Sequence, residues 1–383
     1  MSPSMKFTLL ASVATALIGS SAVAKERLNF AYGFPVNSNV GKAVEAYKTA
    51  VEERSGGEIA VTGFPMTLLS TSESSAGVRD GLADVAFVLP PYHAAEYPTN
   101  LFLHELNPML NLMKHPKGKE PLAYGGAMLE YTLTKCPECL DEYKAQNQVY
   151  TASGVTPLYG MLCKDTKVTN LDEIKGKRLR AGGAGFVRFA ENFDAKAIRI
   201  PTSEAYEALD QGIIDCAMIS IPELTNYNLY EVVTDITPGV PGGVFAGNSS
   251  ANVNRDRWLA MDDATREAML WGGATMSASA TWLSYLDDAD ATAKARELGI
   301  NFHEPAPEMV AAVQEYVKQD LANVAKLFKE NYNVARADEI TADFTPLLEK
   351  WYGLVDEVES FEDLRQVYWD EVLSKVDPAT YAQ

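Results

Sequence analysis

The sequence predicts an α/β protein of two lobes. A strand, a helix and a second strand follow one another near the start, and this order returns after residue 150, which indicates parallel sheets covered by helices. The 383 residues exceed what one compact core commonly holds. Each half also places the pattern G-x-x-D between a helix and an apolar strand, at Gly81 and at Gly212. We therefore expect two lobes of similar build.

The first lobe is predicted from hydrophobic periodicity and turn residues. A turn at Gly33-Phe34-Pro35 separates the first strand from the first helix, and Ser55-Gly56-Gly57 ends that helix. Gly81 suits the left-handed position that closes the second helix. The expected elements are a strand at 28–32, a helix at 40–51, a strand at 58–61, a helix from about 72 and a buried strand at 85–89.

The second lobe follows from the same alternation. Its expected elements are one or two strands in 149–163, a short helix capped by Asn170, a strand at 178–180, a helix at 184–193, a strand at 198–200, a helix capped by Ser203 and a strand after Asp215. Beyond Gly247 the pattern becomes helical, with helices expected at 262–298, 306–332, 344–358 and 361–376. We expect so long a tail to wrap both lobes or to contact another chain.

Residues 1–24 have the pattern of a secretory signal peptide. Lys6 precedes an apolar stretch at 7–18, and Ala22-Val23-Ala24 is a small-residue cleavage site. The apolar stretch is too short to span a membrane, and no later segment approaches 18 uncharged apolar residues. We expect the mature chain, from about Lys25, to be soluble and exported.

The charge and the motifs narrow the function classes. A formal net charge of -19 argues against nucleic acid or an anionic membrane surface as a partner. The four histidines lack the paired spacing of metal ligands, and the chain has no nucleotide fingerprint or nucleophile motif. The sequence therefore predicts no enzymatic activity, no cofactor and no metal site.

The four cysteines fit an oxidising compartment as one or two disulfides. Three pairings are open. We favour Cys136 with Cys139, because a C-x-x-C can close locally, and Cys163 with Cys216, because both lie at strand ends. A redox C-x-x-C is the alternative, but the strand expected before a catalytic motif is missing. A zinc site of all four cysteines would need distant segments to converge.

Positive charge gathers in this acidic chain at residues 175–185, KGKRLRAGGAG. Strand alternation buries Leu179 and turns Arg178 and Arg180 to the other face, so that Arg180 reaches the end of the strand that faces the ligand crevice in open α/β sheets. A guanidinium matches carboxylate or sulfonate oxygens bidentately. The glycines at 182, 183 and 185 let a ligand approach a helix N-terminus. A solvated basic strand edge is the alternative.

These segments, in this order, resemble the solute-binding proteins of tripartite ATP-independent periplasmic (TRAP) transporters, the DctP family. The resemblance covers nearly the whole mature chain and is carried by FAYGFP, SGGEIAVTGFP, VRDGLADVAFV, NLDEIKGKRLRAGG, PTSEAYEALDQGIIDCA and YNLYEVV. It implies a type II-like periplasmic binding protein with a ligand cleft between its lobes, a helix that crosses the hinge and a helical C-terminal extension. It also implies that Arg180 forms a salt bridge with the ligand's carboxylate.

The resemblance extends to the domain boundaries and the pocket. We expect lobe I at 25–152 plus about 247–285, and lobe II, with the C-terminal helices, at 153–246 plus about 286–383. Several positions depart from the family pattern: a polar pair becomes Met218 and Ile219, an asparagine becomes Gly183, and a second arginine falls near Tyr159. These departures predict a less polar or aromatic anion, in a pocket that also includes Phe34, Tyr92, Phe245 and the crossover residue Asn248.

The function that we expect is that of a periplasmic solute-binding protein. It would capture a small organic anion, a carboxylate, sulfonate or aromatic acid, and deliver it to the small and large membrane subunits of a TRAP permease. It would act as a monomer or as a homodimer through the C-terminal helices. Two alternatives are an exported thiol-disulfide oxidoreductase that uses Cys136 and Cys139, and a structural protein that binds a partner through its helical tail.

Overall fold

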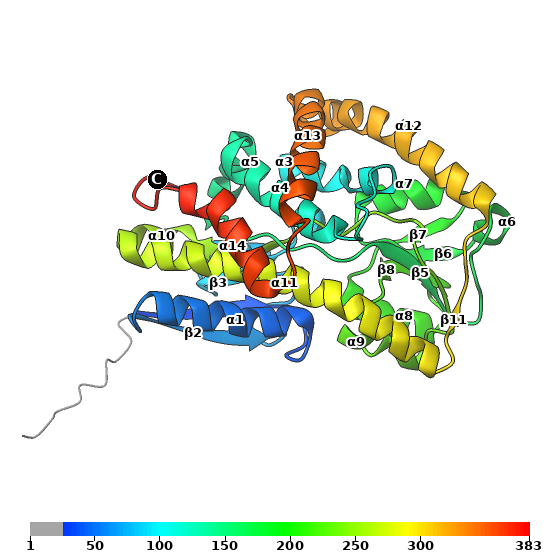
Figure 1. Ribbon diagram of the computed structural model, residues 1–383, viewed down its shortest axis with the longest axis horizontal. Helices are drawn as coiled ribbons and strands as arrows, with labels where there is room; N and C mark the ends of the chain where they lie inside the picture. The colour runs from blue at the N-terminus through cyan, green and yellow to red at the C-terminus, as the bar shows by residue number, and fades with distance from the viewer. Residues whose placement is uncertain (1–25) are drawn as a thin grey trace, which may run out of the picture.

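A computed structural model describes residues 26–383, so the expected signal peptide at 1–24 lies outside the described residues. The described chain forms two β-sheets, each covered by helices, and a helical extension lies over both (Figure 1). Within residues 26–383, no helix is both long enough and apolar enough to cross a membrane. The predicted two-lobed α/β architecture is confirmed, and each sheet with its helices is called a lobe below.

The first lobe is built on a five-stranded sheet in the order β2-β1-β3-β10-β4. The first three strands run parallel, whereas β10 pairs antiparallel with both β3 and β4. The strands are β1 (Glu26–Tyr32), β2 (Ile59–Pro65), β3 (Val85–Val88), β4 (Gln148–Val149) and β10 (Ser249–Asn254), with helices α1 (Asn39–Arg54), α2 (Ser74–Arg79), α3 (Pro98–Glu105), α4 (Glu120–Thr134), α5 (Pro137–Ala145) and α10 (Arg255–Ala260).

The second lobe has six strands in the order β11-β9-β5-β8-β6-β7. Strand β6 runs parallel to β7 and β8, whereas β5 pairs antiparallel with β8 and β9. The strands are β5 (Tyr159–Cys163), β6 (Arg178–Arg180), β7 (Lys196–Ile198), β8 (Cys216–Ser220), β9 (Asp235–Thr237) and β11 (Asn301–Phe302), with helices α6 (Leu171–Ile174), α7 (Ala184–Asn192), α8 (Ala205–Asp210) and α9 (Glu223–Asn226).

One long helix, α11 (Asp263–Glu297), runs from the first lobe to the second (Figure 1). It begins where the Asp262 side chain accepts a hydrogen bond of 2.9 Å from the nitrogen of Thr265, which satisfies one of the free N–H groups of the first turn. It packs against α1 in the first lobe and leads into β11 of the second sheet. The helix therefore crosses between the lobes, as the expected hinge-crossing helix does.

The C-terminal extension consists of α12 (Pro307–Tyr332), α13 (Ala337–Val355) and α14 (Phe361–Glu371). Helices α13 and α14 pack against α4 of the first lobe: the indole nitrogen of Trp351 donates to Glu130 at 2.8 Å, and the hydroxyl of Tyr368 donates to the carbonyl of Leu122 at 2.7 Å. Helix α12 contacts both lobes: Phe328 meets Phe102 of α3 with ring centroids 5.2 Å apart, and Asp320 accepts a hydrogen bond from Arg188 of α7. The tail thus contacts both lobes, and α13 and α14 lie on the first lobe although we expected 286–383 to join the second.

Some element boundaries differ from those expected. Ser203 does not cap a helix, because it lies inside a 3-10 turn (Thr202–Glu204) and α8 begins only at Ala205. Helix α13 starts seven residues before Phe344, since Ala337 and Ile340 are buried as well and extend its apolar face. The last helix ends at Glu371 and is followed by a separate 3-10 turn.

Both favoured cysteine pairs form disulfides. Cys136 and Cys139 are joined at the start of α5, and both residues are buried. Cys163 and Cys216 are direct cross-strand partners on β5 and β8, so their bond links neighbouring strands of the second sheet. No free cysteine remains in the described part of the chain.

Candidate ligand-binding site

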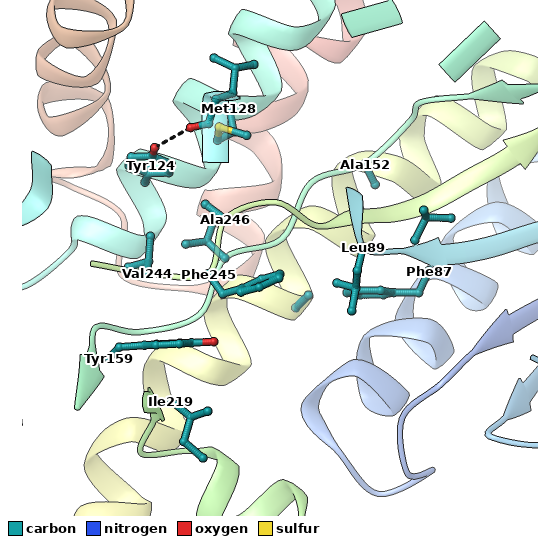
Figure 2. Packing of buried hydrophobic residues seen from close by; sticks show 14 of the residues in the cluster. Phe87, Leu89, Tyr124, Met128, Ala152, Tyr159, Ile219, Val244, Phe245 and Ala246 are labelled. Carbon is teal, nitrogen blue, oxygen red and sulfur yellow. Dashed lines mark hydrogen bonds between the residues drawn. The ribbon is translucent and has the colours of Figure 1, made fainter. Parts of the chain in front are cut away.

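A pocket lies between the two lobes and takes its walls from both. Aromatic rings make up much of the lining, and Figure 2 shows Phe245 with Tyr159 below it and with Leu89 and Phe87 of the first lobe to its right. The pocket is lined by Phe34, Asn39, Val40, Thr71, Phe87, Leu89, Tyr92, Val155, Thr156, Tyr159, Thr202, Ser203, Glu223, Asn226, Tyr227, Phe245, Asn248, Ala280 and Ser284.

The aromatic walls are held by ring-to-ring contacts. Phe34 meets Phe87 edge to face with centroids 4.9 Å apart, and Tyr92 meets Phe245 at 6.3 Å. Tyr159 stacks on Phe186 at 4.8 Å with an interplanar angle of 17°. Such pairs fix the ring positions, so the pocket offers a preformed apolar surface to a flat or hydrophobic ligand.

Arg180 ends strand β6 directly behind this wall, and its residue is fully buried. Its guanidinium donates to the hydroxyl of Thr202 at 2.8 Å, to the hydroxyl of Tyr92 at 3.3 Å and to the carbonyl of Ile200 at 3.0 Å. Thr202 and Tyr92 both line the pocket, whereas Arg180 itself is not among the lining residues. The Arg180 guanidinium therefore lies directly behind the pocket wall, in contact with the hydroxyl groups of Tyr92 and Thr202 that line it.

Arg180 forms no ion pair among residues 26–383, since no carboxylate there lies within 4.0 Å of its guanidinium, and Glu223 of the pocket wall acts on it only from a greater distance. Its neighbour on the strand behaves differently. Arg178, at the other end of β6, forms an ion pair with Asp215 at 2.5 Å. A buried charge without a close counter-charge is costly, so an anion bound next to Arg180 would stabilise it. Arg178 has no such need, because it is already paired with Asp215.

Glu223, the first residue of α9, also lines the pocket and was not predicted from the sequence. Burial raises the pKa of its carboxyl from 4.5 to about 7, while the amide of Asn226 and the charge of Arg180 act in the opposite direction. Asn226 donates to the carboxylate at 3.2 Å. The signal that would have found it is its place just after the buried β8 strand, at the crevice end.

The structure brings five of the predicted pocket residues to the pocket wall: Phe34, Tyr92, Tyr159, Phe245 and Asn248. The side-chain amide of Asn248 donates to the carbonyl of Gly154 at 2.8 Å, which leaves its oxygen available as an acceptor. Arg180 lies behind the wall. The other predicted residues, Gly183, Met218 and Ile219, do not line this pocket, and Met218 is fully buried in β8.

Gly183 lies at the N-terminus of α7 and lines a neighbouring hollow together with Arg199 and Tyr332. Ile219 is buried inside β8 and is not among the lining residues, and Figure 2 shows it below Tyr159, away from Phe245. Within residues 26–383 no group of three or more His, Cys, Asp or Glu side chains is placed to hold a metal ion.

Contacts on two sides of the pocket hold the lobes together. On one side, the nitrogen of Asn39, at the start of α1, donates to Asn226 at 3.1 Å. On another, Arg188 of α7 forms an ion pair with Glu105 of α3 at 2.8 Å and binds Asp320 of α12 at 2.8 Å through two nitrogens. These contacts describe a closed arrangement of the lobes.

Residues 150–327 match the family model of bacterial extracellular solute-binding protein, family 7, also called DctP. This segment of the chain is similar to the DctP family. A solute-binding protein of Albidiferax ferrireducens is 22% identical over 259 residues, which cover 67% of this chain and 73% of that protein.

Solved structures of solute-binding proteins share the fold of this chain. A marine metagenome TRAP protein specific for aromatic acid ligands, in complex with 3-hydroxybenzoate, is 18% identical with a TM-score of 0.72, over 85% of this chain and 98% of that one. A TRAP protein from Rhodoferax ferrireducens, in complex with benzoate, is 19% identical with a TM-score of 0.69, over 86% and 99% of the two chains.

Proposed function

We propose that this chain is a periplasmic solute-binding protein that captures a small organic acid between its lobes and delivers it to a TRAP-type permease. The observation that carries the proposal is Arg180, a fully buried cation just behind the interlobe pocket, without a carboxylate partner in the described chain. A ligand carboxylate supplies the missing negative charge.

The physical basis is the cost of burying charge. A guanidinium removed from water loses its hydration, and a carboxylate that binds it bidentately restores the balance with charge-assisted hydrogen bonds. Closure of the lobes excludes water and strengthens the pair, because the local dielectric constant falls. Tyr92 and Thr202, whose hydroxyls already touch the guanidinium, are positioned to donate to the same acid group.

The aromatic lining favours an acid with a flat or apolar body. Rings of Phe34, Phe87, Tyr92, Tyr159 and Phe245 face the pocket, and such walls bind by apolar contact and by offset stacking. The benzoate and 3-hydroxybenzoate held by two proteins of the same fold are consistent with this chemistry.

The proposal extends to location and partners. The chain acts in the periplasm, after removal of residues 1–24, and its partners are the small and large integral membrane subunits of the permease. It binds no nucleic acid, carries no cofactor and catalyses no reaction. It acts as a monomer or as a homodimer through α12, α13 and α14.

The oxidoreductase alternative has little support from the geometry. Cys136 and Cys139 are buried to 1% and 0% exposure, whereas exchange requires attack by a thiolate on an accessible sulfur. The alternative of a partner-binding structural protein predicts that no small acid stabilises the chain.

The test is a thermal-shift screen of the mature protein against carboxylates, sulfonates and zwitterions, followed by calorimetric titration of each hit. Arg180→Ala should weaken binding of an acid hit by about 2 to 5 kcal/mol. Arg178→Ala is the matched control, because it removes a cation from the other end of the same strand, where Arg178 pairs with Asp215 outside the pocket, and should leave affinity unchanged. Equal affinity of Arg180→Ala and the unmodified protein would refute the proposal, and so would the absence of any hit.

A further inference from the structure

We infer that Glu223 is a specificity-determining residue that accepts a hydrogen bond from an N–H or O–H group of the ligand. The ligand class is thereby narrowed to organic acids that also carry a hydrogen-bond donor, such as a hydroxy acid, an amino acid or a cyclic amide. This inference rests on the proposed function, because it assigns a role to a second group of the same pocket.

The placement of Glu223 provides the first support. Pro222 ends the segment after β8, and α9 then begins with Glu223 at the pocket wall. The carboxylate has no Lys, Arg or His within 4.0 Å in residues 26–383, and its hydrogen bond of 3.2 Å from the Asn226 amide leaves further lone pairs for a donor. An acid that is half buried among aromatic rings, with Arg180 as a cation only beyond ion-pair distance, is costly unless a donor reaches it.

The distribution of charge provides the second support. Arg180 lies behind Tyr92 and Thr202 on one part of the wall. Glu223 lies on another part, where the charge of Arg180 lowers the pKa of its carboxyl and the charge of Asp287, which the side-chain amide of Asn39 contacts at 3.2 Å, raises it. A ligand carboxylate fits the first region, and a donor fits the second. A second ligand carboxylate would meet like charge at Glu223, which disfavours simple dicarboxylates.

The surroundings of Glu223 provide the third support. Tyr159 and Tyr227 are close enough for the charge of Glu223 to raise the pKa of each phenol, although burial is the larger cause in both. Both rings also line the pocket. A hydrogen bond formed in such a water-poor site discriminates strongly, because a ligand without the donor leaves the buried acceptor unpaired.

The test compares acids that differ only in the donor, by calorimetric titration at pH 7.5. One series is 3-hydroxybenzoate, 3-methoxybenzoate and benzoate, and the second pair is pyroglutamate and N-methylpyroglutamate. We expect the unmodified protein to bind the donor-bearing acid of at least one series at least about tenfold more tightly. Glu223→Gln, which keeps an amide oxygen, should reduce this ratio, and Glu223→Leu should bring it close to one. Glu231→Gln, an exposed acid in the same lobe, is the matched control and should leave the ratio unchanged.

The outcomes separate this inference from the proposed function. If acids bind, lose affinity in Arg180→Ala and show no preference for the donor, the inference is wrong and the function stands. The same holds if the preference survives in Glu223→Leu. If no acid in either series or in the wider screen binds the unmodified protein, both fall together.

Discussion

The backbone nitrogen of Asn39 donates a hydrogen bond of 3.1 Å to Oδ1 of Asn226, and this contact joins the two lobes at the edge of the pocket. Asn226 simultaneously donates from its amide to Glu223 at 3.2 Å. The side chain of Asn226 thus connects Glu223 to the opposite lobe. A ligand that orders Glu223 therefore also orders the hydrogen bond between Asn226 and Asn39 that holds the lobes closed.

Asn226→Ala should therefore shift the chain toward an open arrangement. It removes two hydrogen bonds, each worth roughly 0.5 to 1.5 kcal/mol, so ligand affinity should fall about 5- to 100-fold, with most of the change in the dissociation rate. Small-angle scattering should report a larger radius of gyration at a ligand concentration that closes the unmodified protein. Asn323→Ala, an exposed position on α12, should change neither quantity. Equal dissociation rates in all three proteins would show that this contact does not contribute to closure.

The buried ion pair of Arg188 and Glu105 is expected to be essential for stability. The Glu105 side chain is fully buried, and burial raises the pKa of its carboxyl while the charge of Arg188 lowers it. Arg188→Met removes that charge and should reduce the free energy of unfolding by about 3 to 5 kcal/mol. A group with a raised pKa in the folded state loses stability as pH rises, so the deficit should be smaller at pH 4.5 than at pH 8.

Chemical denaturation at these two pH values measures the deficit. Arg178→Met provides the comparison, because it removes an arginine from a more exposed ion pair in which the Arg178 side chain is 41% accessible. Its effect should be within about 1 kcal/mol. A deficit of Arg188→Met that is equally small, or that grows toward low pH, would contradict the assigned role.

The features of the site that depend on local sequence pattern could be predicted from the sequence. The alternation of residues 178–180 places Leu179 on one face of the strand and Arg178 and Arg180 on the other, because a strand turns successive side chains to opposite faces. The two sheets, the long interlobe helix and both disulfides follow from similar local rules, namely β-α-β order, helix periodicity and loop closure.

What the sequence did not predict depends on contacts between distant segments. Glu223 becomes a pocket residue only because α9 meets the first lobe, where the Asn226 side chain links Glu223 to Asn39, 187 residues earlier in the sequence than Asn226. Gly183 was predicted to contact the ligand because of its place in the family motif. At the start of α7, however, it faces His104 and does not line the pocket. Similarly, α13 and α14 pack against α4, where large rings such as Trp351 are buried. Periodicity predicts that these helices have an apolar face, but not which lobe that face covers.

The acid in the pocket should also make stability depend on pH. The carboxyl of Glu223 has a pKa of about 7 in the folded chain against an ordinary value of 4.5, so between these values the folded state binds more protons than the unfolded state. The free energy of unfolding therefore falls as pH rises from about 4.5 to 7, and the cost is fully present above pH 7. Glu223→Gln cannot ionise, so it should be more stable than the unmodified protein by up to about 3 kcal/mol at pH 8 and by little at pH 4.

Asp288, whose pKa burial raises to about 6, adds a decline of the same sign in both proteins, so the difference between the two curves isolates Glu223. Denaturant unfolding across pH 4 to 8 without ligand measures both curves. Parallel curves would mean that Glu223 titrates as in the unfolded chain. A divergence that grows from pH 5 to 7 would mean that the closed pocket imposes a charge cost on this acid, which a ligand donor then relieves.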